Sequence, residues 1–134
     1  MNRTSLVEAV QEIATQKGYT FCPTSAEGLP AHASKLPTLV MIQPKMLRIE
    51  GRKHGKITYN LTLHLLHRGA TLPPDEQTAL LNHAEEEAID TLTILSTHPQ
   101  VIAIENLQTS ASTSRLSHHG DVTITATAEV VCHF

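Results

Sequence analysis

The sequence predicts an α+β domain in which helices cover an antiparallel sheet. The final residues, 122–134, alternate apolar and polar side chains to the last position, as a strand buried on one face does. Two other segments repeat apolar residues every three or four positions, which is the period of an amphipathic helix. The predicted order is helix, strand, strand, helix, strand, strand, so two long hairpins form the sheet.

Length and composition limit the possible classes. We expect a single domain over 1–134, because a second core would need more residues than remain after the first. No apolar run approaches a membrane span and no export signal is visible at the N-terminus, so we expect a cytoplasmic chain with no membrane partner. The net charge of −3 and the 3% aromatic content limit nucleic acid to a weak local contact.

The first helix is predicted from Ser5 to about Lys17. Ser5 and Glu8 have the spacing of a capping box, and Gly18 can supply the left-handed stop. The expected buried face consists of Leu6, Val10, Ile13 and Ala14.

Residues 21–37 predict a long loop, since prolines and small residues replace any periodic pattern. A loop of this length is either partly disordered or used for contact with a partner, and the sequence leaves both open.

The first hairpin is predicted over 38–65. Its first strand, 38–50, is interrupted by Pro44, which marks an edge or a bulge because proline cannot donate to a sheet ladder. A turn at 51–56 leads into a second strand that alternates from Ile57 to Leu65.

A long second helix is predicted from about Asp75 to His98, with a core stripe that includes Ala84 and Ala88. The second hairpin begins at Val101. A polar segment, 109–117, and a turn at 118–121 precede the closing strand.

The sequence contains no recognisable catalytic motif, so we expect no enzyme activity, no catalytic residue and no cofactor. Nine histidines are present without converging spacing, and the adjacent pair His118 and His119 would point apart in a strand, so no metal site is expected. Cys22 and Cys132 have no metal-ligand spacing, and whether they pair stays open.

One charged segment is a candidate interface. It surrounds the tip of the first hairpin and consists of Arg48, Arg52, Lys53, His54 and Lys56. Such a group can meet a phosphate or a carboxylate-bearing neighbour, or it can simply keep the turn soluble.

Residues 50–59, which lead into a long apolar strand, and the terminal strand 122–134 complete an element order that resembles small phage or prophage tail-completion (tail-terminator-like) proteins. The resemblance rests on length and element order. It implies a subunit that self-associates into a ring, caps the tail tube and contacts the head connector or other tail proteins. It also implies a location in the cytoplasm during assembly and in the virion afterwards.

Two other classes stay open. One is a cytoplasmic adaptor or small homo-oligomeric interaction domain that uses the Thr-rich face of the sheet. The other is a small ligand-binding domain or enzyme, which requires a concave pocket with converging titratable groups.

Overall fold

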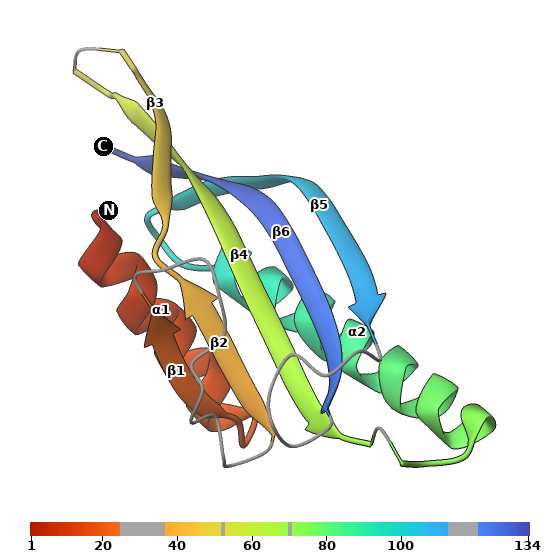
Figure 1. Cartoon of the computed structure of the whole chain (residues 1–134). Helices are drawn as coiled ribbons and strands as arrows, with labels where there is room; N and C mark the ends of the chain where they lie inside the picture. Colours follow the sequence, from red (N-terminus) through yellow and green to blue (C-terminus); the bar gives the residue numbers. More distant parts are fainter. Residues whose placement is uncertain (25–36, 52, 70, 113–120) are drawn as a thin grey trace.

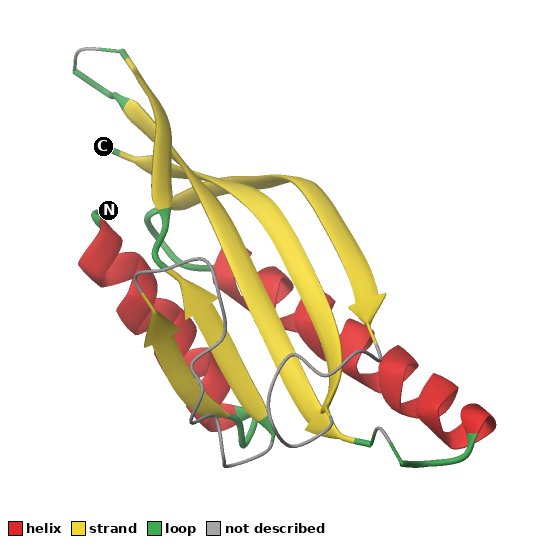
Figure 2. Cartoon of the chain, viewed as in Figure 1, coloured by secondary structure: helices red, strands yellow, loops and turns green. Residues whose placement is uncertain are grey.

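The computed structural model describes residues 1–24, 37–51, 53–69, 71–112 and 121–134, and in this part of the chain two helices lie against one face of a six-stranded sheet (Figures 1 and 2). The predicted α+β class is confirmed. The elements are α1 (Arg3–Gln16), β1 (Thr20–Thr24), β2 (Thr38–Ile42), β3 (Lys45–Glu50), β4 (Lys56–Arg68), α2 (Pro74–Ser96), β5 (Val101–Ser112) and β6 (Asp121–His133).

Strand β4 organises the sheet. The strand order is β1-β2-β4-β6-β5, and β3 also pairs with β4, along the edge that β2 occupies further on. The β3–β4 and β5–β6 pairs are the two predicted antiparallel hairpins. The β1–β2 pair is parallel, which the sequence did not predict.

The core lies between the sheet and the helices. Leu61, Leu63 and Leu65 alternate along β4, belong to the core beneath the helices and are at most 1% exposed. The four residues predicted for the buried face of α1 are all buried. Ala84 and Ala88 of α2 are fully buried, and their small size lets the helix lie close to the sheet. Neither helix in the described part of the chain is long and apolar enough to cross a membrane.

The predicted start of α1 is wrong by two residues. Asn2 is the N-cap, and its side-chain oxygen accepts a hydrogen bond from the Ser5 backbone N–H at 2.8 Å. Ser5 therefore lies inside the helix, so Ser5 and Glu8 do not form a capping box. Asparagine caps helices as well as serine does, which explains the earlier start. Gly18 has a φ of +84°, as its predicted role as a left-handed stop requires.

The predicted loop 21–37 is also wrong at its beginning. Residues 21–24 belong to β1, whose Phe21 is paired with Leu39 of β2 and packs against the core. Pro23 fits here because β1 is an edge strand, where a missing N–H leaves no ladder bond unmade. Residues 25–36 lie outside the described part.

Two further predicted boundaries differ from those in the structure. The strand predicted over 38–50 is two strands, separated at Gln43 and Pro44. The polar segment predicted over 109–117 continues strand β5 as far as Ser112, while residues 113–120, with His118 and His119, lie outside the described part.

Candidate functional site

The most unusual surface of the molecule is a projecting hairpin. We call it the hairpin arm and define it as residues 45–51 and 53–58. It extends beyond the N-terminal end of α1 (Figure 1). Its exposed apolar side chains are Met46 (45%), Leu47 (48%) and Ile49 (48%), and Phe134 beside it is 70% exposed. Apolar residues gathered in this way on one surface are typical of a contact with another protein.

The backbone explains why the arm separates from the body. Pro44 has no N–H to donate and stands where β2 ends and β3 begins. A β-bulge between Met46 and Arg48 leaves Leu47 without a partner residue on β4. Gly51, in the turn, has a φ of +84°, a conformation that favours glycine. Local backbone chemistry therefore favours the departure of the arm from the body.

The end of the chain packs on the arm. The Phe134 backbone N–H donates to the Gly55 carbonyl oxygen at 2.8 Å. A Cβ atom at Gly55 would lie 3.0 Å from the Phe134 Cβ and 3.1 Å from the Glu50 carbonyl oxygen. Glycine at this position lets Phe134 approach the turn, so Phe134 adds to the exposed apolar surface. The closing strand predicted over 122–134 runs from Asp121 to His133, so the prediction is wrong at Phe134, which lies beyond the strand with an exposed ring.

The base of the arm is held by the start of α1. Arg3 Nε donates to the Pro44 carbonyl oxygen at 3.0 Å, and the Arg3 guanidinium lies 6.0 Å from the centre of the Tyr59 ring. The Tyr59 hydroxyl donates to the Met1 carbonyl oxygen at 3.3 Å. These contacts fix the direction in which the arm leaves the body.

The structure places four of the five predicted interface residues on this arm. Arg48 is engaged within the molecule, since its Nε lies 2.9 Å from Glu50 and its Nη1 lies 3.5 Å from Glu129. Lys53, His54 and Lys56 are exposed. Arg52 lies outside the described residues.

The sequence reasoning missed one basic residue and the apolar part of the surface. Lys45 begins β3 and adds a further positive charge to the arm. In the sequence, Met46, Leu47 and Ile49 have the pattern of ordinary strand residues. The local signal that this segment projects from the sheet was Pro44 before it and Gly51 after it. The arm is therefore both basic and apolar.

The helical layer has the opposite charge. Helix α2 carries six carboxylates and neither lysine nor arginine: Asp75, Glu76, Glu85, Glu86, Glu87 and Asp90. Helix α1 adds Glu8 and Glu12, both exposed. The chain thus separates its charges between the arm and the helices, although its net charge is only −3.

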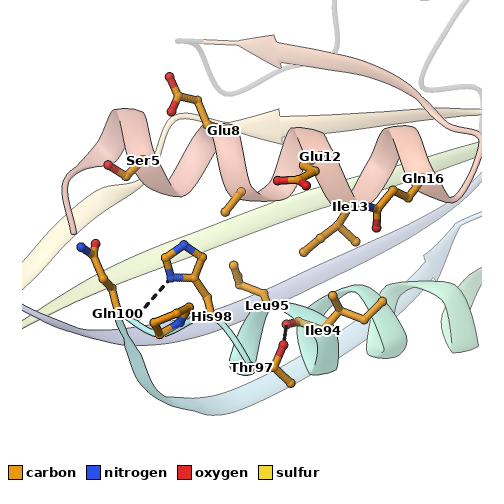
Figure 3. A pocket seen from close by; sticks show the side chains of 12 residues that line it. Ser5, Glu8, Glu12, Ile13, Gln16, Ile94, Leu95, Thr97, His98 and Gln100 are labelled. Carbon is orange, nitrogen blue, oxygen red and sulfur yellow. Dashed lines mark hydrogen bonds between the residues drawn. The ribbon is translucent and has the colours of Figure 1, made fainter.

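A groove of about 550 Å³ runs between α1 and the end of α2 (Figure 3). We call it the helical groove. Its lining combines Glu8, Glu12 and Gln16 from α1 with an exposed Ile94 and Leu95 from α2. The turn after α2 completes it, where His98 Nδ1 accepts a hydrogen bond from the Gln100 backbone N–H at 3.1 Å. Ser5 also belongs to the lining, and its hydroxyl donates to Asn2 Oδ1 at 2.9 Å.

A polar cluster fills the junction of α1, β4 and α2. The Tyr19 hydroxyl lies 2.7 Å from His67 Nε2, and the ring of His83 lies edge-on to the His67 ring. Burial, reinforced by the nearby charge of Glu87, raises the pKa of Tyr19, so its hydroxyl stays protonated. Burial and His83 lower the pKa of His67, against the opposing effect of Glu87, so that ring stays neutral. The cluster satisfies buried polar groups.

Lys17 joins the two helices beside that cluster. Its Nζ lies 2.8 Å from a Glu87 carboxylate oxygen and also contacts Asp90. Burial alone would lower the pKa of Lys17, but its hydrogen bonds to Asp90 and Glu87 raise the pKa above the usual value. The lysine therefore stays charged and ties the C-terminal end of α1 to α2.

Within residues 1–24, 37–51, 53–69, 71–112 and 121–134, no group of three His, Cys, Asp or Glu side chains could hold a metal ion. Cys22 and Cys132 are both free. Burial raises the pKa of the Cys132 thiol, against a small opposing effect of the terminal ammonium, and this disfavours the reactive thiolate.

No protein-family model matches the chain, and no curated protein sequence matches it. Its fold is similar to that of a chain in the virion of a native gene transfer agent (GTA) particle, with a TM-score of 0.59. The two chains are 9% identical, and the match covers 96% of this chain and 95% of the other. The likeness at this identity is one of fold, and it extends over nearly the whole of both chains.

Proposed function

We propose that this chain is a structural subunit of a phage or prophage tail, a tail terminator or tail-completion protein that self-associates into a ring. In this role it caps the tail tube and contacts the head connector or other tail proteins. It assembles in the cytoplasm and becomes part of the virion. The fold shared over nearly the whole chain with a component of a GTA virion supports a role in a particle.

The observation that carries the proposal is the exposed apolar surface of the hairpin arm. Burying one large aliphatic side chain stabilises by about 1.5–3 kcal/mol. Met46, Leu47, Ile49 and Phe134 remain 45–70% exposed in the isolated chain, although hydrogen bonds hold the base of the arm in place. A rigid arm with this surface is suited to a permanent contact with a neighbouring subunit.

The arm also suits a ring in particular. Rings close through heterologous contacts, in which one surface of a subunit meets a different surface of the next. A projecting arm at one end of the molecule provides the first surface of such a pair. We propose that Arg48, Arg52, Lys53, His54 and Lys56 belong to this contact surface, with nucleic acid limited to a weak local contact.

We propose no enzyme activity and no cofactor for the chain. The groove has the concave shape that a ligand-binding domain needs, but its lining brings no nucleophile and base together. The polar cluster at Tyr19 and His67 holds its groups in the forms that satisfy one another. Both features are consistent with a structural subunit that assembles with others.

Mass measurement by size-exclusion chromatography with light scattering tests the proposal over roughly two decades of protein concentration. A concentration-dependent step to a closed oligomer of about six subunits, visible as rings in the electron microscope, is expected. A dimer that does not change with concentration would instead favour an interaction domain of the adaptor type. A strict monomer at every concentration would contradict self-assembly and would make ligand screening of the groove the next experiment.

A further inference from the structure

We propose that the helical groove of one copy of this chain receives the hairpin arm of a second copy. This inference rests on the proposed ring assembly and identifies the second surface of its repeating contact. The groove is open, about 550 Å³ in volume, and lies between two helices that leave Ile94 exposed.

Charge complementarity favours the arm as the occupant. The groove presents Glu8 and Glu12 from α1 and belongs to a helical layer in which α2 has no lysine or arginine. The arm presents exposed Lys53 and Lys56, and neither has an ion pair with any described residue. Opposite charges on two surfaces steer their encounter and set their register.

The apolar parts of the two surfaces also correspond. Ala9, Ile94 and Leu95 form apolar lining between the polar residues of the groove, and Leu47 protrudes from the bulge of β3. A volume in the range that holds a small-molecule ligand is enough for a few side chains. Contact would remove apolar surface from water on both copies, as stable interfaces require.

The geometry excludes the arm of the same copy. Arg3 and Tyr59 fix the base of the arm, which runs past the start of α1 and away from the helices (Figure 1). The arm and the groove are therefore two different surfaces of one subunit. Their mutual contact is heterologous, and successive copies can join until the ring closes.

A charge exchange between two variants tests the pairing. The groove variant carries Glu8→Lys and Glu12→Lys, and the arm variant carries Lys53→Glu and Lys56→Glu. Alone, each variant brings like charges together and should need about tenfold more protein to assemble in about 0.1 M salt. Mixed in equal amounts, the two should assemble again, because each acidic arm meets a basic groove and each basic arm meets an acidic groove.

The matched control is Asp75→Lys with Glu76→Lys, the same charge change on α2 outside the groove. It should assemble like the unchanged chain, and thermal melts of all variants establish that they fold. A mixture that assembles no better than its components, while the unchanged chain forms rings, would overturn the arm-in-groove contact and leave the proposed function standing.

A photo-crosslink tests the contact without requiring a ring. Lys53 is replaced by p-benzoylphenylalanine in the otherwise unchanged chain, which is irradiated at high concentration. Intermolecular products should join position 53 to peptides that contain residues 5–16 or 94–100. Products on other peptides, or none, would overturn the inference, whereas a failure of the unchanged chain to form rings would overturn the proposed function.

Discussion

Strand β4 passes through two regions, the body and the hairpin arm, in which apolar side chains differ in exposure. In the body, Leu61, Leu63 and Leu65 face two helices and are at most 1% exposed. On the arm, Met46, Leu47 and Ile49 of its neighbour β3 are 45–48% exposed, since the helices do not extend that far. Strands in both regions contain large aliphatic residues. Burial therefore depends on whether another element covers the strand, and on the arm that cover has to come from outside the chain.

This comparison separates folding from assembly. The body contains most of the buried residues that supply the free energy of folding, whereas the exposed side chains of the arm contribute little to that free energy and leave apolar area available for contact. Changes in the body should alter stability, and changes on the arm should alter association. Paired substitutions, one in the body and one on the arm, distinguish the two effects.

The largest effect is expected from truncating the same residue type in the two regions. Leu63→Ala removes a fully buried side chain from the core and should lower the free energy of unfolding by about 2–5 kcal/mol. Leu47→Ala should change it by no more than about 0.5 kcal/mol, because Leu47 is 48% exposed. Urea titration of both variants at a concentration where the chain is monomeric measures the difference. Equal losses would mean that the arm packs on the body as a part of the core does.

Leu47→Ser should weaken association without unfolding the chain. Because Leu47 is 48% exposed, association can bury about half of its side chain, and losing that burial removes about 1 kcal/mol, or roughly fivefold in the concentration required for half-assembly. Leu72→Ser, at a leucine that is 37% exposed and outside the arm, is the matched control and should assemble normally. Light scattering across a dilution series gives both values. An unchanged midpoint for Leu47→Ser would remove the arm from the interface.

Lys17 and Arg48 allow the same comparison for ion pairs. Lys17→Met removes a cation whose side chain is 15% exposed and which bridges Glu87 and Asp90, and it should lower the free energy of unfolding by about 1 kcal/mol. Arg48→Met removes an ion pair to the exposed Glu50 and a longer one, of 3.5 Å, to Glu129, and it should have a smaller effect because Arg48 itself is 47% exposed. Thermal melts measure both. A larger loss for Arg48→Met would show that the arm contributes to folding.

Much of the body could be predicted from the sequence, because burial on one face of a strand or helix produces a periodic pattern of apolar residues. Alternation in β4 and β6, and a repeat of three to four residues in the helices, arise directly from burial on one face. The expected buried face of α1 and the small residues Ala84 and Ala88 of α2 are buried as predicted. The parallel strand β1 was missed, because five residues containing Pro23 carry no clear period and their pairing with β2 is not local.

Of the candidate site, only the charged residues of the arm were predicted from the sequence. Arg48, Lys53, His54 and Lys56 stand close together in the sequence, so their grouping at a hairpin tip could be read directly. The exposure of Leu47 could not be predicted, because it depends on where the helices end in space. The helical groove could not be predicted either, since it forms between residues of α1 and residues some ninety positions further on, such as Leu95.

The smallest effect is expected from pH, through two half-buried histidines of β4. Burial lowers the pKa of His64, whose Nδ1 lies 2.8 Å from Thr125 Oγ1, and burial with His83 lowers the pKa of His67 despite Glu87. The unfolded chain then binds more protons than the folded chain as pH falls below the ordinary value of 6.5, so stability present above that pH is lost progressively below it. His67→Gln should reduce this loss between about pH 7.5 and pH 5.5, because it removes one of the two body histidines whose pKa is lowered by folding. Urea midpoints of the unchanged chain and of the variant, measured across this range, provide the two slopes. Equal slopes would mean that the loss of stability at low pH does not arise at His67 in the body, and would contradict its assignment to this region.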